Sequence, residues 1–106
     1  MVLTFSNGTI TTTASEQNLF DITADSHFAT WVFTHNLQAA DTVVLKVYVY
    51  DENGTTMRLY ETETISGVQA DPSIFIPFIP TKQYRVSIQR TAGSDRAVTW
   101  QRIQST

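Results

Sequence analysis

The stretch from Thr42 to Ile65 most constrains the fold, because it has the pattern of one long β-hairpin. Its first arm is TVVLKVYVY, and the turn DENG and a second arm, TTMRLYETETI, follow. An Asn-Gly step between two β-rich runs is among the strongest short-range hairpin signals. Because side chains alternate along a strand, we expect the core-facing side of the first arm to carry Val43, Leu45, Val47 and Val49.

Two registers are open to this hairpin, and a shift by one residue turns every side chain of an arm to the other face. A bare two-residue Asn-Gly loop would place Val49 opposite Arg58. A three-residue loop, with Gly54 as a left-handed bulge, would place Val49 opposite Met57. The second register separates apolar from polar side chains, so the sequence predicts it together with a positive φ at Gly54.

Length and composition exclude several classes of protein. The 106 residues suffice for one domain, and without cysteine the sequence offers no disulfide framework and no thiolate zinc site. The formal net charge is −3 and no basic cluster is present, which argues against a nucleic-acid partner. No apolar run approaches the ~18 residues of a membrane helix, and the start MVLTFSNG lacks a signal-peptide pattern. We therefore expect neither nucleic acid nor membrane as a partner.

The spacing of turn signals predicts an all-β fold of about eight strands with no long helix. We expect an antiparallel two-sheet β-sandwich, either jelly-roll or immunoglobulin-like, formed by residues 1–106 as a single domain. Residues 2–5 could form a first strand, or residues 1–8 could be an N-terminal arm that docks on a neighbouring subunit. The expected strands cover residues 9–14, 18–23, 27–36, 42–50, 55–65, 73–80, 83–89 and 96–104.

Several local features follow from the same pattern. Turns are expected at Ser6-Asn7-Gly8 and at Ala24-Asp25-Ser26. Pro77 cannot donate to a strand ladder, so residues 73–80 should form an edge strand or the end of a ladder. The alternation in QYRVSIQ predicts that Tyr84, Val86 and Ile88 point inward and that Arg85, Ser87 and Gln89 point outward.

No group of residues has the spacing of a catalytic or metal site. His27 and His35 are eight residues apart on one expected strand, which is roughly 26 Å and too far to share a metal. Glu61 and Glu63 share a strand face at about 7 Å, a separation found in inverting glycosidases. A small sandwich without a substrate cleft instead favours two solvated carboxylates near the hairpin end. We predict no catalytic residue, no metal and no cofactor, and hence no enzyme.

The aromatic side chains offer two interpretations. Trp31, Trp100 and Tyr84 could join the hairpin tyrosines in a stacking platform for a sugar. The same pattern suits a face on which a second sheet or another subunit packs, since Tyr and Arg are enriched at interfaces. The candidate platform consists of Tyr48, Tyr50, Arg58 and Tyr60.

The apolar segment SIFIPFIP gives the strongest indication of a protein partner, because soluble monomers rarely expose a patch of that size. Alternatively, residues 2–5 fold over it within the same chain. The candidate interface residues are Val2, Leu3, Phe5, Ile74, Phe75, Ile76, Phe78 and Ile79.

The segments SEQNLFDIT and YRVSIQRTAGSDRAVTWQRI, in a small, cysteine-free, Thr-rich and wholly β chain, resemble small β-sandwich accessory proteins of tailed-phage virions, in particular head-decoration (cement) proteins. The resemblance implies a structural, non-enzymatic protein without a cofactor, made in the host cytoplasm and located in the virion. Its partner would be the major capsid protein, and copies of the chain would form a homo-oligomer, commonly a trimer. The alternative function is a carbohydrate-binding or adhesion module that uses the tyrosine platform.

Overall fold

The computed structural model describes residues 2–50 and 56–105, and every regular element in them is a β-strand. The predicted all-β class is therefore confirmed, and the described part contains no helix that could cross a membrane. The expected φ at Gly54 falls outside the described residues. The strands are β1 (Leu3–Thr11), β2 (Gln17–Phe33), β3 (Thr42–Tyr50), β4 (Met57–Ser66), β5 (Ser73–Ala92) and β6 (Ala97–Ser105).

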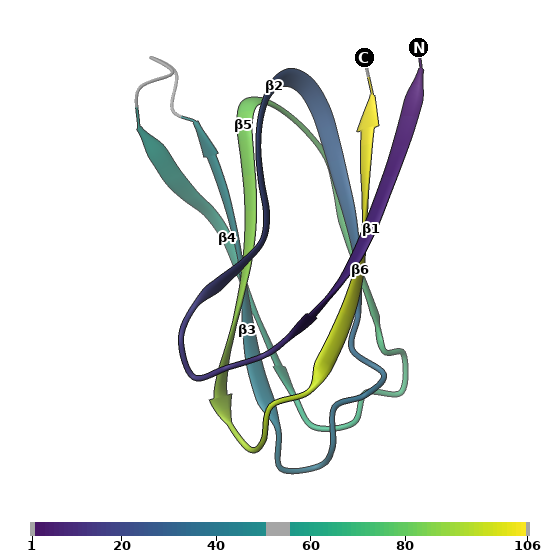
Figure 1. Cartoon of the computed structure of the whole chain (residues 1–106), viewed down its shortest axis with the longest axis vertical. Helices are drawn as coiled ribbons and strands as arrows, with labels where there is room; N and C mark the ends of the chain where they lie inside the picture. Colours follow the sequence, from purple (N-terminus) through teal and green to yellow (C-terminus); the bar gives the residue numbers. More distant parts are fainter. Residues whose placement is uncertain (1, 51–55, 106) are drawn as a thin grey trace.

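The six strands form one hydrogen-bonded antiparallel sheet in the order β1-β6-β2-β5-β3-β4, which folds over on itself. Figure 1 shows β2 and β5 curving together over the end of the molecule at which both termini lie. Their pairing shifts at this bend, between Thr23 opposite Gln83 and Ser26 opposite Thr81. The turn predicted around residues 24–26 is therefore wrong, because a paired strand continues through it as an irregularity.

The fold-over divides the sheet into two layers of four strand segments each. The first layer contains β1, β6, residues 26–33 of β2 and residues 73–81 of β5. The second layer contains residues 17–23 of β2, residues 83–92 of β5, β3 and β4. Six strands thus supply the eight segments expected from the sequence, and the connectivity is that of a jelly roll. Residues 73–81 pair only with β2 among the described residues, so the predicted edge position of this segment is confirmed.

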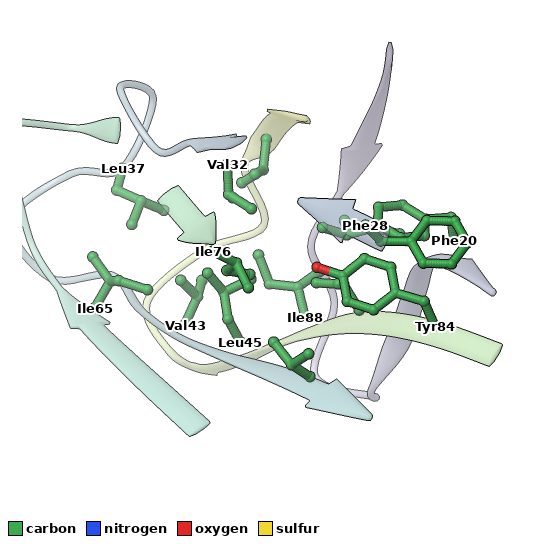
Figure 2. Close-up of a cluster of buried hydrophobic side chains, with 14 residues drawn as sticks. Phe20, Phe28, Val32, Leu37, Val43, Leu45, Ile65, Ile76, Tyr84 and Ile88 are labelled. Carbon is green, nitrogen blue, oxygen red and sulfur yellow. The ribbon is translucent and has the colours of Figure 1, made fainter. Parts of the chain in front are cut away.

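The core lies between the two layers and is built as the alternation predicts. Val43, Leu45 and Val47 of β3 are at most 2% exposed. The inward positions of β5 are fully buried, and Figure 2 shows side chains of both layers packed together. Burying such aliphatic and aromatic side chains is the main stabilising term for a domain of this size. The inward residues of β5 are Tyr84, Val86 and Ile88.

One polar contact lies across the middle of this core. The ring of Tyr84 stacks on that of Phe28, with centroids 5.1 Å apart and planes 7° apart. Its hydroxyl is 2.8 Å from Oγ1 of Thr30, and both residues are fully buried. Because Tyr84 belongs to the second layer and Thr30 to the first, this hydrogen bond fixes how the layers face each other.

The register of the β3–β4 hairpin differs from the prediction. Val49 lies opposite Arg58 rather than Met57, and an irregularity beside Val47 shifts the pairing again. The prediction assumed that apolar residues of β4 would be buried. β4 is instead an edge strand in which only Ile65 is buried, so the remaining apolar side chains could not set the register.

The predicted turn at Ser6-Asn7-Gly8 is also wrong, because β1 continues through it and pairs residue for residue with β6. Gly8 lies opposite Trp100, and a Cβ added at Gly8 would lie 2.7 Å from Cζ2 of that indole. The glycine therefore leaves room for the ring rather than making a turn. Residues 3–8 form an edge strand, and their use as an arm on a neighbouring subunit stays a prediction.

Candidate functional site

The outward side of the first layer carries two aromatic side chains, Trp31 and Phe33, that are not among the candidate interface residues expected from the sequence. Thr30 and Val32 are buried in the core, so the alternation of β2 points Trp31 and Phe33 outward. The ring of Trp31 lies 6.2 Å from that of Phe33 and 4.7 Å from that of Phe75, measured between centroids. The signal was present in the sequence as the period-two pattern of HFATWVF.

These rings belong to a surface that we call the apolar outer face. Strand pairing sets Phe5 of β1 beside Ile103 of β6, and Ile103 beside Ala29 of β2. The two flanking edges of this layer are strongly exposed, with Phe5 at 56% and Phe78 at 46%. The members of the apolar outer face are Leu3, Phe5, Trp31, Phe33, Phe75 and Phe78.

The structure divides the eight candidate interface residues into two groups. The first group is exposed along the two edges of the first layer and comprises Val2, Leu3, Phe5, Phe75 and Phe78. The second group packs in or against the core and comprises Ile74, Ile76 and Ile79. The segment 73–80 is therefore not one apolar patch, because its side chains alternate between the core and the surface. Residues 3–5 pair with β6, so the N-terminal segment does not fold over residues 73–80.

The outward side of the second layer is polar by contrast. Glu16 accepts hydrogen bonds from the hydroxyls of Tyr48, at 2.7 Å, and of Ser87. These two bonds lower the pKa of Glu16, the one from Ser87 more strongly. Ser87 points outward as predicted, but it is fully buried beneath this contact. Beside it, Arg85 forms an ion pair with Asp21 at 2.8 Å.

The structure does not gather the candidate tyrosine platform on one open face. Burial, and next the hydrogen bond to Glu16, raise the pKa of Tyr48, and the guanidinium of Arg85 lies 5.5 Å from its ring centroid. Arg58 is paired with Val49, a core-facing position of β3. Tyr60 is 59% exposed on the edge strand. Of the other aromatic candidates, the indole of Trp100 and the ring of Tyr84 pack within the sandwich. Sugar binding by the tyrosines stays a prediction.

Glu61 and Glu63 lie at a groove on the open side of the sandwich. They are paired with Val47 and Leu45, so they share the inner face of the second layer, as neighbours on one strand face should. Their groove has a volume of about 260 Å³ and is otherwise lined by apolar residues of β3 and β5. Both carboxylates are exposed, and neither forms an ion pair with another described residue. Apart from the two glutamates, the lining side chains are apolar and offer no polar group to orient a sugar for hydrolysis.

Residues 2–50 and 56–105 contain no group of three His, Asp or Glu side chains that could hold a metal ion. The most strongly held acid is Asp41, which is 1% exposed and joins two loops. It accepts hydrogen bonds from the N–H groups of Gln38 and Ser94 and from Nε of Arg96. These bonds, the one from Gln38 first, lower the pKa of Asp41 to about 2. Its partners are two backbone N–H groups and one guanidinium, so the role of Asp41 is to hold the two loops together. We call this contact the loop clamp.

Comparisons with known proteins support the fold. No protein-family model and no curated protein sequence matches the chain. A solved structure described as "Bacillus endospore appendages form a novel family of disulfide-linked pili" is 15% identical and has a TM-score of 0.65, covering 99% of this chain and 87% of that chain. The crystal structure of PirA is 5% identical and has a TM-score of 0.59, covering 92% of this chain and 90% of that chain. At these identities the likeness shows a shared all-β architecture.

Proposed function

We propose that this chain is a non-enzymatic structural protein that associates with other protein subunits through its apolar outer face. The observation that carries the proposal is the contrast between the two outward surfaces. One presents Phe5, Phe75 and Phe78 to solvent, whereas the other is a network of ion pairs and hydrogen bonds around Glu16 and Arg85. Monomeric proteins rarely expose contiguous apolar patches larger than a few hundred Å², and patches above that size mark association sites.

We further propose the role implied by the phage resemblance, namely a capsid-decoration protein that binds the major capsid protein as a homo-oligomer in the virion. Binding across joints between capsid subunits would stabilise the head by mass action. The pilus protein of similar fold is described as disulfide-linked. The sequence of this chain has no cysteine, so it offers no thiol for a disulfide link, and we propose that its contacts with a partner are non-covalent. An apolar face supplies such contacts.

Sedimentation of the purified protein across the micromolar range tests the proposal. The double variant Phe5→Ser/Phe78→Ser removes two exposed rings, and exposed positions of this kind seldom affect folding. Leu59→Ser is the matched control, because Leu59 is 53% exposed on β4 of the other layer. We expect the wild type and the control to self-associate and the double variant to be monomeric. A monomeric wild type, or equal behaviour of both variants, would refute self-association through this face.

Co-sedimentation with undecorated phage heads tests the decoration role separately. We expect the wild type and Leu59→Ser to pellet with the heads and the double variant to stay in solution. Absence of all three proteins from the pellet would refute the decoration role.

A further inference from the structure

A shallow hollow of about 410 Å³ lies on the outward side of the first layer. It occupies the half of that layer that is farther from the bend in β2 and β5. This volume lies near the lower end of the range of small-molecule sites, roughly 300–1,000 Å³. Its side-chain lining comes from three strands, β1, β6 and β2. The lining residues that matter here are Asn7, Thr9, Phe33, Thr99 and Gln101.

The floor of the hollow is a grid of uncharged polar side chains. Strand pairing sets Asn7 opposite Gln101 and Thr9 opposite Thr99. These positions alternate with the inward residue Val98, so all four side chains share the outward face. None of the four side chains makes a hydrogen bond to another described residue. Two amides and two hydroxyls, each able to donate and to accept, therefore lie side by side without an internal partner.

An aromatic wall borders this floor. Phe33 lies in the same cross-strand row as Thr99 and is only partly buried. The ring of Trp31 stacks on it with an angle of 10° between the planes, and Phe75 packs against Trp31 in turn. Backing by two further rings holds the Phe33 ring in place, so a ligand would not have to order it on binding.

We propose that this hollow binds a neutral saccharide through one pyranose ring. Such a ring has an apolar C–H face that can pack on Phe33. Its hydroxyls both donate and accept hydrogen bonds, as do the amides of Asn7 and Gln101. The lining has no charged side chain, so it lacks the Arg or Lys that recognises phosphate or carboxylate. Because the hollow is shallow and would cover one side of a ring, we expect a dissociation constant on the order of millimolar for a single sugar.

This site adjoins the apolar outer face and shares Phe33 with it, but its polar floor lies away from the most exposed rings of that face. Leu3, Phe5 and Phe78 lie toward the fold-over, whereas the hollow begins at the row of Asn7 and extends away from it. The site also differs from the tyrosine platform, which belongs to the opposite layer. The association variant Phe5→Ser/Phe78→Ser should therefore still bind sugar.

Saturation-transfer NMR with a panel of methyl glycosides of glucose, galactose, mannose and N-acetylglucosamine tests the proposal. We expect at least one glycoside to receive saturation from the wild-type protein. Asn7→Ala and Gln101→Ala should each weaken its binding by about tenfold, which corresponds to the loss of one net hydrogen bond. Phe33→Leu keeps an apolar side chain at the wall and removes the aromatic face, and it should also weaken binding.

Tyr60→Ala is the matched control, since this tyrosine is exposed on the other layer. It should bind the glycoside as the wild type does. Saturation transfer to none of the four glycosides would overturn the proposal. So would binding that survives both amide substitutions, or binding that is lost in Tyr60→Ala. Each variant's amide spectrum reports whether it is folded, and a misfolded Phe33→Leu leaves the two amide variants to decide the question.

Discussion

Removing the hydroxyl of Tyr84 should destabilise the protein out of proportion to the one atom lost. In the fully buried site between the layers, this hydroxyl and that of Thr30 are each other's only hydrogen-bond partner among the described residues. Tyr84→Phe deletes the bond and leaves the Thr30 hydroxyl unsatisfied in a dry site, which costs about 1–3 kcal/mol. Thr30→Val should cost a similar amount, because it leaves the tyrosine hydroxyl without a partner.

The double variant Tyr84→Phe/Thr30→Val distinguishes this mechanism from a general loss of packing. Replacing both partners by apolar groups of similar shape can be nearly neutral. We therefore expect the double variant to be no less stable than either single variant, with a coupling of about 1–2 kcal/mol between the sites. Urea unfolding followed by tryptophan fluorescence measures all four proteins, and the m value should not change. Additive effects, or single variants within about 0.5 kcal/mol of the wild type, would refute the contact between the layers.

The same site predicts a dependence on alkaline pH. Burial raises the pKa of Tyr84 to about 12, from 10.0 for an exposed tyrosine. Because the folded pKa is the higher one, the contribution to stability is complete below pH 10 and is lost as the pH rises toward 12. Tyr84→Phe should lack this part of the loss of stability at alkaline pH. Ultraviolet absorbance should show a tyrosine ionisation near unfolding in the wild type that is missing from the variant.

Three further predictions concern close approaches and the loop clamp. Gly8→Ala should destabilise the fold by about 1–3 kcal/mol, because its Cβ would press on the Trp100 ring, and thermal unfolding should show this. Gly93→Ala should cost at least as much, since φ there is +82° and the Cβ would lie 2.6 Å from Cα of Asp41; an unchanged midpoint would contradict the geometry. Asp41 has a folded pKa below its ordinary 3.8, so its contribution to stability is present above that value and is lost as the pH falls toward 2. The variant Asp41→Asn should be less stable at neutral pH. Its free energy of unfolding should also fall less steeply than that of the wild type as the pH is lowered from about 4 toward 2.

Much of the core could be predicted from the sequence because it depends on local periodicity. Val43, Leu45 and Val47 alternate with polar or mixed positions, and so do the inward residues of β5, and both sets are buried as expected. The bends in β2 and β5 could not be predicted in the same way. Ala24-Asp25-Ser26 has the composition of a turn, but the two strands bend at the same level and are paired on both sides of the bend. Whether the chain turns or continues as a bent strand at residues 24–26 depends on its pairing with β5, which is far away in the sequence.

The candidate site shows the same limit. The apolar character of Phe5, Phe75 and Phe78 was evident, and each was expected at an interface. Their common face arises only because β6 and β2 lie between β1 and β5 in the sheet. The hollow beside Phe33 depends further on cross-strand rows of residues that no local pattern brings together. The hairpin register was mispredicted for a related reason, since β4 turned out to be a solvated edge.

The solvent exposure of the two tryptophans tests most directly whether the apolar outer face is the association surface. Trp31 lies on that face, whereas Trp100 packs within the sandwich against Phe20. Protein labelled with 5-fluorotryptophan should give two ¹⁹F resonances, and Trp31→Phe assigns them. On raising the protein concentration into the associated state, the solvent-isotope shift of the Trp31 signal should fall while that of Trp100 stays constant. An unchanged Trp31 shift in a demonstrably associated sample would contradict the account.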